Sequence, residues 1–303
     1  MVRPYPPLPA RIKSLLSKTK KGGSLKTTPW KGFLVHIYHW VPSSGAPPAW
    51  SCVHSWINLQ LPDGAKRTFK QSLAGSVRYV WNNVVRDFLS TDAEWMFSTH
   101  HDVAFVPETL LRLMSWNEPL ITATVFMRHN PALPQIWRTY DEKVQNQYAI
   151  RVQDTRKWFY EHKEYIRPGP FVMEPKPDDA LVEVGFTSTA CTLIHRSVFE
   201  DIRAKIPNQG DGLWFVCDNE LTGGGEDRRF YEYAKHVGYI PYVDRSCIAG
   251  HVAGDIPTSS LDFIAWDSVG DFLNTGEPLK IDLDKVEMDR EYRASKEVVN
   301  DGD

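Results

Sequence analysis

Several features that would assign the chain to a well-defined class of protein are missing from its sequence. No apolar run approaches the ~20 residues that a membrane-spanning helix needs, and the proline-rich residues 1–10 lack the apolar core of a secretory signal. The four cysteines lie far apart and form no CxxC pair, so no structural zinc site is expected. Internal repeats and low-complexity tracts are also lacking. We therefore expect a cytoplasmic globular protein with reduced, buried thiols.

Acidic residues are missing from the first part of the chain. Residues 1–31 contain eight Lys or Arg and no Asp or Glu, although the whole chain has a net charge of −3. The remainder holds 27 basic against 38 acidic residues. A basic arm on an acidic body can be a solvated tail, or it can contact an anionic membrane or a nucleic acid. All three alternatives stay open at this point.

Apolar periodicity predicts alternating strands and helices from residue 32 onward. The pattern indicates strands over residues 32–41, 93–98 and 120–127, helices over 76–90 and 107–115, and an apolar segment of mixed period over 50–61. Later residues indicate a strand, a small-residue turn and a strand over 181–195, a helix from Ser197, a strand at "LWFV", a helix opened by Glu226 and a final strand. This order predicts an α/β fold of Rossmann-like type, with a mostly parallel central sheet flanked by helices.

The chain divides into three expected parts. A basic N-terminal arm covers residues 1–31, the α/β domain covers 32–255, and a helical C-terminal extension covers 256–303. Within the domain, residues 129–180 lose clean periodicity and are rich in Pro, Trp and Tyr. We interpret that stretch as a loop-rich insertion that carries one helix near residues 154–162.

Polar residues follow directly on one of the predicted buried strands. His100, His101 and Asp102 follow the apolar strand over 93–98 after a single residue, Thr99. Ligands of such sheets bind at the carboxyl ends of the strands, and burying polar groups there costs several kcal/mol unless they find partners. These residues therefore indicate a bound ligand, a metal or a hydrogen-bond network.

Four segments, in this order, resemble the nucleotide-sugar glycosyltransferases of the GT-A fold, of the family-2 type. They are "VWNNVVRDFL" around Asn82, "TDAEWMFSTHHDVAFVPETLLRL", "VGFTSTACTLIHRSVFE", and "GGGEDRRFYEYAKHVGY" followed by the later "GH" of Gly250 and His251. The likeness covers residues 32–254. It implies a GT-A domain that transfers a sugar from a nucleoside-diphosphate sugar to an acceptor hydroxyl in a metal-dependent reaction, which we expect to be inverting.

Two positions depart from the family pattern. The DxD motif is here His100-x-Asp102, and Trp81 stands where an Arg is common. In the family the second Asp usually touches the metal, so the change weakens the implied nucleotide contact more than the metal contact. The resemblance implies Asp102 and His251 as metal ligands, with His100 as a further candidate for the metal or the ribose. An imidazole ligand favours Mn²⁺, with Mg²⁺ as the alternative.

The resemblance also implies residues for catalysis and for donor binding. Asp227 is the expected base, because inverting members of the family use this position, and Glu226 is its rival. The two acids could instead simply stabilise the start of a helix. Candidate contacts with the donor nucleotide or its phosphates are His39, Asn82, His100 and Arg128. Plain packing stays open for His39, and an exposed salt bridge for Arg128.

Other functions remain compatible with the sequence. The altered motif also suits a catalytically degenerate protein that only binds a sugar or nucleotide. A metal-dependent hydrolase could be built on His100, His101, Asp102 and His251. The acceptor can be a protein, a glycan, a lipid or, in the host cytoplasm if the protein is viral, hydroxymethylated bases of DNA, for which the basic arm would be a contact. Residues 129–180 are the expected acceptor side.

Overall fold

The structure, a computed structural model, describes the greater part of the predicted α/β domain. The described residues are 34–41, 48–62, 65–73, 77–127, 132–137, 147–167, 169–172, 176–206, 213–216, 226–253, 256–260 and 263. The basic arm, most of the predicted C-terminal extension, the glycine-rich stretch 217–225 and Arg128 lie outside them. Of strand β1 only the backbone is described. Within the described part, no helix is both long and apolar enough to cross a membrane.

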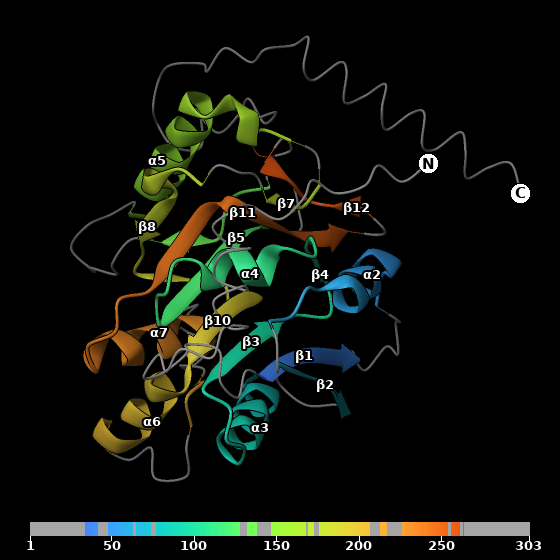
Figure 1. The fold of residues 1–303 in the computed structure, drawn as a ribbon. Helices are drawn as coiled ribbons and strands as arrows, with labels where there is room; N and C mark the ends of the chain where they lie inside the picture. The colour runs from blue at the N-terminus through green and yellow to red at the C-terminus, as the bar shows by residue number, and fades with distance from the viewer. Residues whose placement is uncertain are drawn as a thin grey trace, which may run out of the picture.

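The domain is organised around one open sheet (Figure 1). Its strands lie in the order β12-β11-β5-β10-β3-β1-β2. They are β1 (Leu34–Val41), β2 (Lys66–Leu73), β3 (Trp95–Thr99), β5 (Leu120–Phe126), β10 (Cys191–His195), β11 (Tyr242–Ala253) and β12 (Ile256–Pro257). Strand β1 pairs in parallel with β2 and β3, and β5 pairs in parallel with β11. This is a mixed α/β fold with an open sheet.

The prediction of a mostly parallel sheet is wrong, because β10 runs antiparallel to both of its neighbours, β3 and β5. The reason is the connection that precedes it. Strand β9 (Phe186–Thr187) pairs with β6 (Ile136–Trp137), which follows the carboxyl end of β5. Only residues 188–190 separate β9 from β10. A parallel strand would need a crossover of a dozen or more residues, so β10 enters the sheet from the carboxyl edge of β3 and β5.

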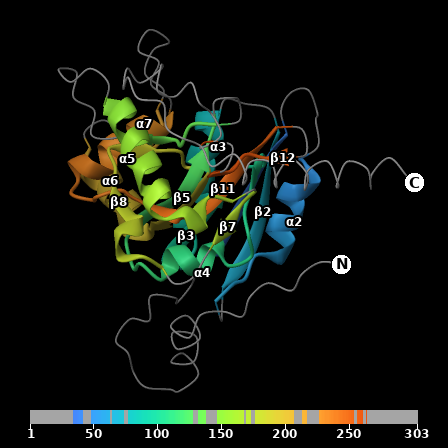
Figure 2. The same ribbon diagram turned by 90° about the horizontal axis from the view of Figure 1, so that it is seen from above.

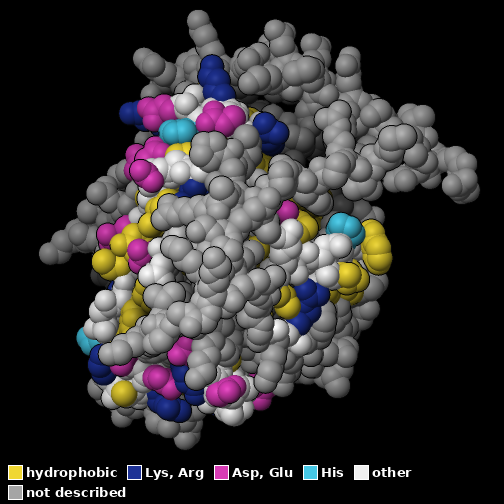
Figure 3. Space-filling view, in the orientation of Figure 1, with side chains coloured by type: hydrophobic (Ala, Val, Ile, Leu, Met, Phe, Trp, Pro, Cys, Tyr) yellow, Lys and Arg dark blue, Asp and Glu magenta, His cyan; other side chains and the backbone are white. Residues whose placement is uncertain are grey.

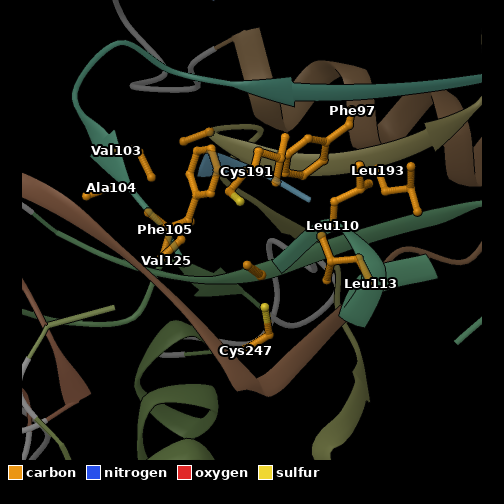
Figure 4. Close-up of a cluster of buried hydrophobic side chains, with 14 of the residues drawn as sticks. Phe97, Val103, Ala104, Phe105, Leu110, Leu113, Val125, Cys191, Leu193 and Cys247 are labelled. Carbon is orange, nitrogen blue, oxygen red and sulfur yellow. The ribbon is translucent and has the colours of Figure 1, made fainter. Parts of the chain in front are cut away.

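Helices cover both faces of the sheet (Figure 2). On one face lie α2 (Trp50–Asn58) and α4 (Thr109–Met114), and on the other α3 (Val77–Leu89), α6 (Arg196–Lys205) and α7 (Glu226–His236). Successive residues of β3 serve the two faces in turn, since Phe97 packs with α2 and α4 while Met96 packs with α3, α6 and α7. Figure 4 shows the first cluster, in which Phe97, Leu110 and Cys191 meet from β3, α4 and β10.

The insertion forms a third cluster beside β5 and β11. It contains α5 (Gln147–Glu161), the short helices η1 (Lys163–Tyr165) and η2 (Asp178–Ala180), and the strand β7 (Phe171–Val172). Strand β7 and the adjoining strand β8 (Leu181–Glu183) both pair with β11. Phe159 and Tyr165 pack against Phe126 and Ile248 of the sheet. Charged side chains cover the outer surface around α5 (Figure 3).

Most elements predicted from periodicity are confirmed: α3, β3, α4, β5, α5, α6, α7 and β11 lie where strands or helices were expected. The apolar segment of mixed period is the helix α2. Strands β2 and β4 (Val103–Ala104) were not predicted, and residues 213–216, expected to be a strand, have no regular structure. Cys52, Cys191 and Cys247 are buried free thiols as expected, and burial raises the pKa of the Cys191 and Cys247 thiols.

A buried ion pair joins α4 to β11. Arg112 Nε donates to Asp244 Oδ2 at 3.0 Å, and the two side chains are 1% and 0% exposed. The same carboxylate oxygen accepts from Trp116 Nε1 at 2.7 Å, and Ser246 N–H donates to Asp244 Oδ1 at 2.8 Å. Asp244 lies where the pairing of β11 with β5 shifts register, before Ile248. The pair therefore fixes the start of the second half of β11.

Replacing Arg112 by Met would leave the Asp244 carboxylate buried without its cation, and we expect the free energy of unfolding to fall by about 3–5 kcal/mol. The matched control is Lys157→Met, which breaks the Lys157–Glu161 pair, whose side chains are 77% and 55% exposed. That change should cost less than about 0.5 kcal/mol. Urea unfolding monitored by circular dichroism measures both. Equally small losses in the two variants would contradict this account of the buried pair.

Candidate functional site

Several chain segments that are remote in sequence meet at the carboxyl edge of the sheet. Cys191, the first residue of β10, lies opposite Thr99, the last residue of β3. Gly250 of β11 lies opposite Phe126, the last residue of β5. Residues 100–102, which follow β3, the turn 188–190, which precedes β10, and His251, which lies within β11, are therefore at one edge. They include Asp102, His100 and His251, which the sequence singled out.

The strand order reverses beside this edge. From β1 the chain continues to β2 on one side, and then returns to place β3 on the other side of β1. Such a switch point, outside the carboxyl ends of the strands, is the usual ligand site of open α/β sheets. Ile37 lies opposite Thr99 in the β1–β3 pairing, so the backbone of His39 lies just beyond the end of β3. The side chain of His39 and the whole of Arg128 are outside the described residues.

The turn 188–190 connects the end of β3 to the start of α7. The backbone N–H of His100 donates to the carbonyl of Ala190 at 3.0 Å. The next residue back, Thr189, contacts Asp227 twice: its N–H donates to Oδ2 at 3.3 Å and its hydroxyl donates to Oδ1. Asp227 and His100 thus bind two successive residues of the same turn, Thr189 and Ala190.

The environment of Asp227 makes its carboxyl group a weaker acid than an ordinary aspartate. Burial, and then the neighbouring charge of Glu226, raise the pKa of Asp227 from its ordinary 3.8 to about 7, while the two bonds from Thr189 lower it. Both carboxylate oxygens accept from Thr189, and Glu226 and Asp227 both lie in the first turn of α7, where acids are also favourable for the helix. A carboxylate with a pKa near neutrality is well matched to general base catalysis. Glu226, its rival, acts here by raising that pKa.

A second hydroxyl network lies one turn further along α7. The hydroxyl of Tyr231 is 3.1 Å from Thr122 Oγ1, which is 3.0 Å from Thr192 Oγ1. All three residues are fully buried. Burial raises the pKa of Tyr231, and the charge of Asp227 raises it further. The tyrosine therefore stays protonated close to the carboxylate.

The two residues expected to bind a metal are neighbours in space. Strand β4 pairs with β11, so that Val103 lies opposite His251, and the N–H of Val252 donates to the carbonyl of Asp102 at 2.9 Å. His251 Nδ1 lies 2.7 Å from the Phe126 carbonyl. A carbonyl only accepts, so this bond places a proton on Nδ1, whereas the 3.3 Å contact of the Gln135 amide nitrogen with the same atom would need Nδ1 unprotonated. The shorter bond favours the Nδ1–H tautomer, which leaves the lone pair of a neutral ring on Nε2. No group of three or more His, Cys, Asp and Glu side chains able to hold a metal occurs within the described ranges.

Gly250 allows another segment to approach the backbone beside His251. A Cβ at Gly250 would lie 2.2 Å from the carbonyl oxygen of Thr258 and 2.9 Å from Pro257 Cβ. That close approach lets the N–H of Thr258 donate to the carbonyl of His251 at 2.8 Å. The glycine before His251 is therefore required by packing.

Asn82 has a different role from the nucleotide contact that was expected. Its amide nitrogen donates to the carbonyls of Arg78 and Phe215 at 2.9 and 2.8 Å, and its oxygen accepts from the N–H groups of Trp214 and Phe215 at 2.8 and 3.0 Å. The side-chain amide donates two hydrogen bonds and accepts two, and the residue is 2% exposed. Asn82 fixes residues 214–215 against α3, which explains why that stretch is not a strand.

Two residues of the site were not found from the sequence. Thr189 was seen only as part of a small-residue turn, and nothing in its neighbourhood indicated a carboxylate partner. Gln135 belongs to the stretch without periodicity, yet its Nε2 lies 3.3 Å from His251 Nδ1. Its carbonyl also accepts from the Thr187 hydroxyl at 2.5 Å. The insertion therefore contributes to the same edge.

Comparison with known proteins adds little to this picture. No protein-family model matches the chain, and no curated protein matches it. One solved structure to which the chain is similar is the crystal structure of A197 from STIV, with 12% sequence identity and a TM-score of 0.42. The match covers 74% of this chain and 87% of that chain. A likeness at this level carries no conclusion about function, which must come from the site.

Asp227→Asn removes an ionisable group that is largely shielded from water, and its effect on stability should depend on pH. Because the folded-state pKa is raised, the folded wild type holds a proton that the unfolded chain has lost between about pH 4 and 7. Wild-type stability should therefore fall by up to about 4 kcal/mol across that interval, and the variant should lack this fall. Urea unfolding from pH 4 to 8 measures it. Asp92→Asn, a change at an exposed position, should leave the pH dependence of stability as it is in the wild type. The same pH dependence in Asp227→Asn as in the wild type would contradict the raised pKa.

Asn82→Ala should destabilise the fold, because it leaves buried backbone groups of Trp214 and Phe215 without partners. We expect a loss of about 2–4 kcal/mol, measured by urea unfolding. Asn83→Ala, on the exposed side of the same helix, should change stability by less than about 0.5 kcal/mol. Weaker nucleotide binding by Asn82→Ala at unchanged stability would instead support the contact expected from the sequence.

Proposed function

We propose that this protein is a metal-dependent glycosyltransferase of the GT-A type. It would move a sugar from a nucleoside-diphosphate sugar to an acceptor hydroxyl, with inversion at the anomeric carbon. The observation that supports the proposal is that strand pairing and the contacts of the turn 188–190 bring the chain segments of Asp227, His100, Asp102 and His251 to one sheet edge, although they come from three distant parts of the chain. The adjoining switch point between β1 and β3 supports a nucleotide at that edge.

Asp227 is the proposed base. It would take the proton from the acceptor hydroxyl as that oxygen attacks the anomeric carbon, a role worth ~10²–10⁴-fold in rate. A pKa of about 7 supports this role, because the carboxylate is substantially ionised at neutral pH and still basic enough to accept a proton. Glu226 is the source of part of that basicity.

Asp102 and His251 are the proposed metal ligands, with His100 as a further candidate. The bond between His251 Nδ1 and the Phe126 carbonyl supports this, because ligating histidines commonly donate their other ring N–H to such an acceptor. One carboxylate and one imidazole suit Mn²⁺, with Mg²⁺ as the alternative. Two protein ligands suffice where phosphate oxygens of the substrate complete the coordination. The cation would supply Lewis-acid stabilisation of the departing diphosphate.

The acceptor is proposed only as a hydroxyl group, on a protein, glycan, lipid or modified DNA base. Gln135 supports the insertion as the acceptor side, because it brings that part of the chain to within 3.3 Å of His251. The bond from Thr187 to the Gln135 carbonyl holds this residue in place from β9.

Asp102→Asn tests the proposal without knowledge of the acceptor, since water can replace it in slow hydrolysis of the donor. A panel of nucleotide sugars is incubated with Mn²⁺, and the released nucleoside diphosphate is measured. We expect turnover of at least one donor by the wild type, its loss on metal removal, and at least ~10²-fold less in Asp102→Asn, because the leaving diphosphate loses its charge stabilisation. Asp92→Asn should retain wild-type turnover.

Two results would replace the proposal with one of its rivals. Nucleotide binding, seen by thermal shift, without turnover of any donor would favour a catalytically degenerate binding protein. Zinc retained through purification, together with hydrolysis that does not need manganese, would favour a hydrolase on His100, His101, Asp102 and His251.

A further inference from the structure

Thr189 holds both oxygens of the Asp227 carboxylate from a different element of the fold. Its hydroxyl donates to Oδ1 and its backbone N–H donates to Oδ2 at 3.3 Å. The residue is fully buried, and Asp227 itself is partly exposed at the start of α7. One residue therefore determines the orientation of the carboxylate plane.

The turn that carries Thr189 is fixed independently of Asp227. Ser98 Oγ donates to the carbonyl of Thr189 at 3.3 Å, and the N–H of His100 donates to the carbonyl of Ala190 at 3.0 Å. The N–H of Ala190 in turn donates to Ser188 Oγ at 3.2 Å. Since these bonds tie the turn to the end of β3, Thr189 is the fixed partner to which Asp227 is fitted.

We propose that Thr189 is the positioning residue of the catalytic base, holding the Asp227 carboxylate in one orientation and favouring its ionised form. The catalytic part of this inference rests on the proposed function, whereas the contact itself does not. Two donated bonds stabilise the charged form of a carboxylate. They oppose burial and the charge of Glu226, which favour the neutral acid.

The other groups that face Asp227 do not replace this contact. On α7 they are Glu226, whose charge disfavours ionisation, and Tyr231, whose hydroxyl is bound to Thr122 on β5. At the end of β3 the titratable neighbour is His100, which contacts the turn through its backbone N–H. The turn 188–190 brings hydroxyls and no charge. Without the Thr189 hydroxyl, the described surroundings of Asp227 favour protonation.

Thr189→Val keeps the size of the side chain and its backbone N–H but removes the hydroxyl. We expect the pKa of Asp227 to rise by about one unit, so that the acid limb of the pH–rate profile moves upward by the same amount. At pH 7, kcat should fall about five- to tenfold, while KM for the donor stays the same because donor binding does not use Asp227. Thr189→Ser restores a hydroxyl and should restore the wild-type acid limb.

Two measurements are made on wild type, Thr189→Val and Thr189→Ser. The first is a ¹³C NMR titration of aspartate carboxyl carbons, with the Asp227 resonance identified by its loss in Asp227→Asn. The second is the pH dependence of nucleoside-diphosphate release. An upward shift of the titration in Thr189→Val, reversed in Thr189→Ser, supports the inference. An Asp227 titration that is the same in all three proteins overturns it.

The titration does not depend on turnover, so it separates this inference from the proposed function. A shifted Asp227 titration in a protein that turns over no donor would support the positioning role of Thr189 and refute the proposed glycosyltransferase activity. Turnover that Thr189→Val leaves unaltered at every pH would support the proposed activity and contradict the positioning role of Thr189.

Discussion

The antiparallel placement of β10 between β3 and β5 is the constraint on which the site depends. Its pairing places Cys191 opposite Thr99 and Thr192 opposite Thr122. The turn before β10 therefore lies at the carboxyl edge, where a parallel strand in the same place would have brought its amino end to the opposite edge. From that position the turn binds His100 on one side and Asp227 on the other. A sheet with every strand parallel could not make this bridge.

Burial at this edge has two opposite effects on the same groups. Removing water disfavours the charged form of Asp227, and it also strengthens each hydrogen bond that remains. The hydroxyls of Thr122, Thr192 and Tyr231 satisfy one another, so polar groups can be enclosed there without an unpaired charge. On the other face of the sheet, Arg112 and Asp244 neutralise each other and anchor β11. The polar residues of the interior thus hold the strands whose ends form the site.

The sequence was sufficient to predict the regular, well-buried elements, and its failures have physical causes. Helix α3 was recognisable by its apolar periodicity, and strands β3 and β5 by short, mostly apolar runs, because every residue of these two strands is buried. Helix α2 was not, because Trp50 and Ile57, 70% and 58% exposed, interrupt its polar face. Strand β2, "KRTFKQSL", was not recognised; among the described strands it lies at the edge of the sheet beside β1, and it carries the lysines typical of edges. The direction of β10 depends on a short connection that hydrophobic periodicity does not encode. The candidate residues could be chosen by type, but whether an amide such as Asn82 faces a ligand or a backbone is decided by tertiary packing.

Trp81 and His100, the two positions that depart from the pattern of the family that the sequence resembles, are in contact with each other. The rings of Trp81 and His100 lie 5.4 Å apart, and Trp81 also stacks on Phe215 at 5.2 Å. Phe215 stacks in turn on Phe230 of α7, with ring centroids 4.7 Å apart. The rings therefore form a column from the end of β3 to α7.

A carboxylate at position 100 beside this column of rings would lose solvation, and the neighbouring side chain, Trp81, would bring no cation to compensate for it. A histidine suits the column, because its ring packs against an aromatic face and still presents nitrogen atoms. The two changes are therefore consistent with each other. Through Phe215 and Phe230, these two rings connect the end of β3 to α7, the helix that carries Asp227. The ring contacts therefore help to fix the distance between the proposed metal ligands and the proposed base.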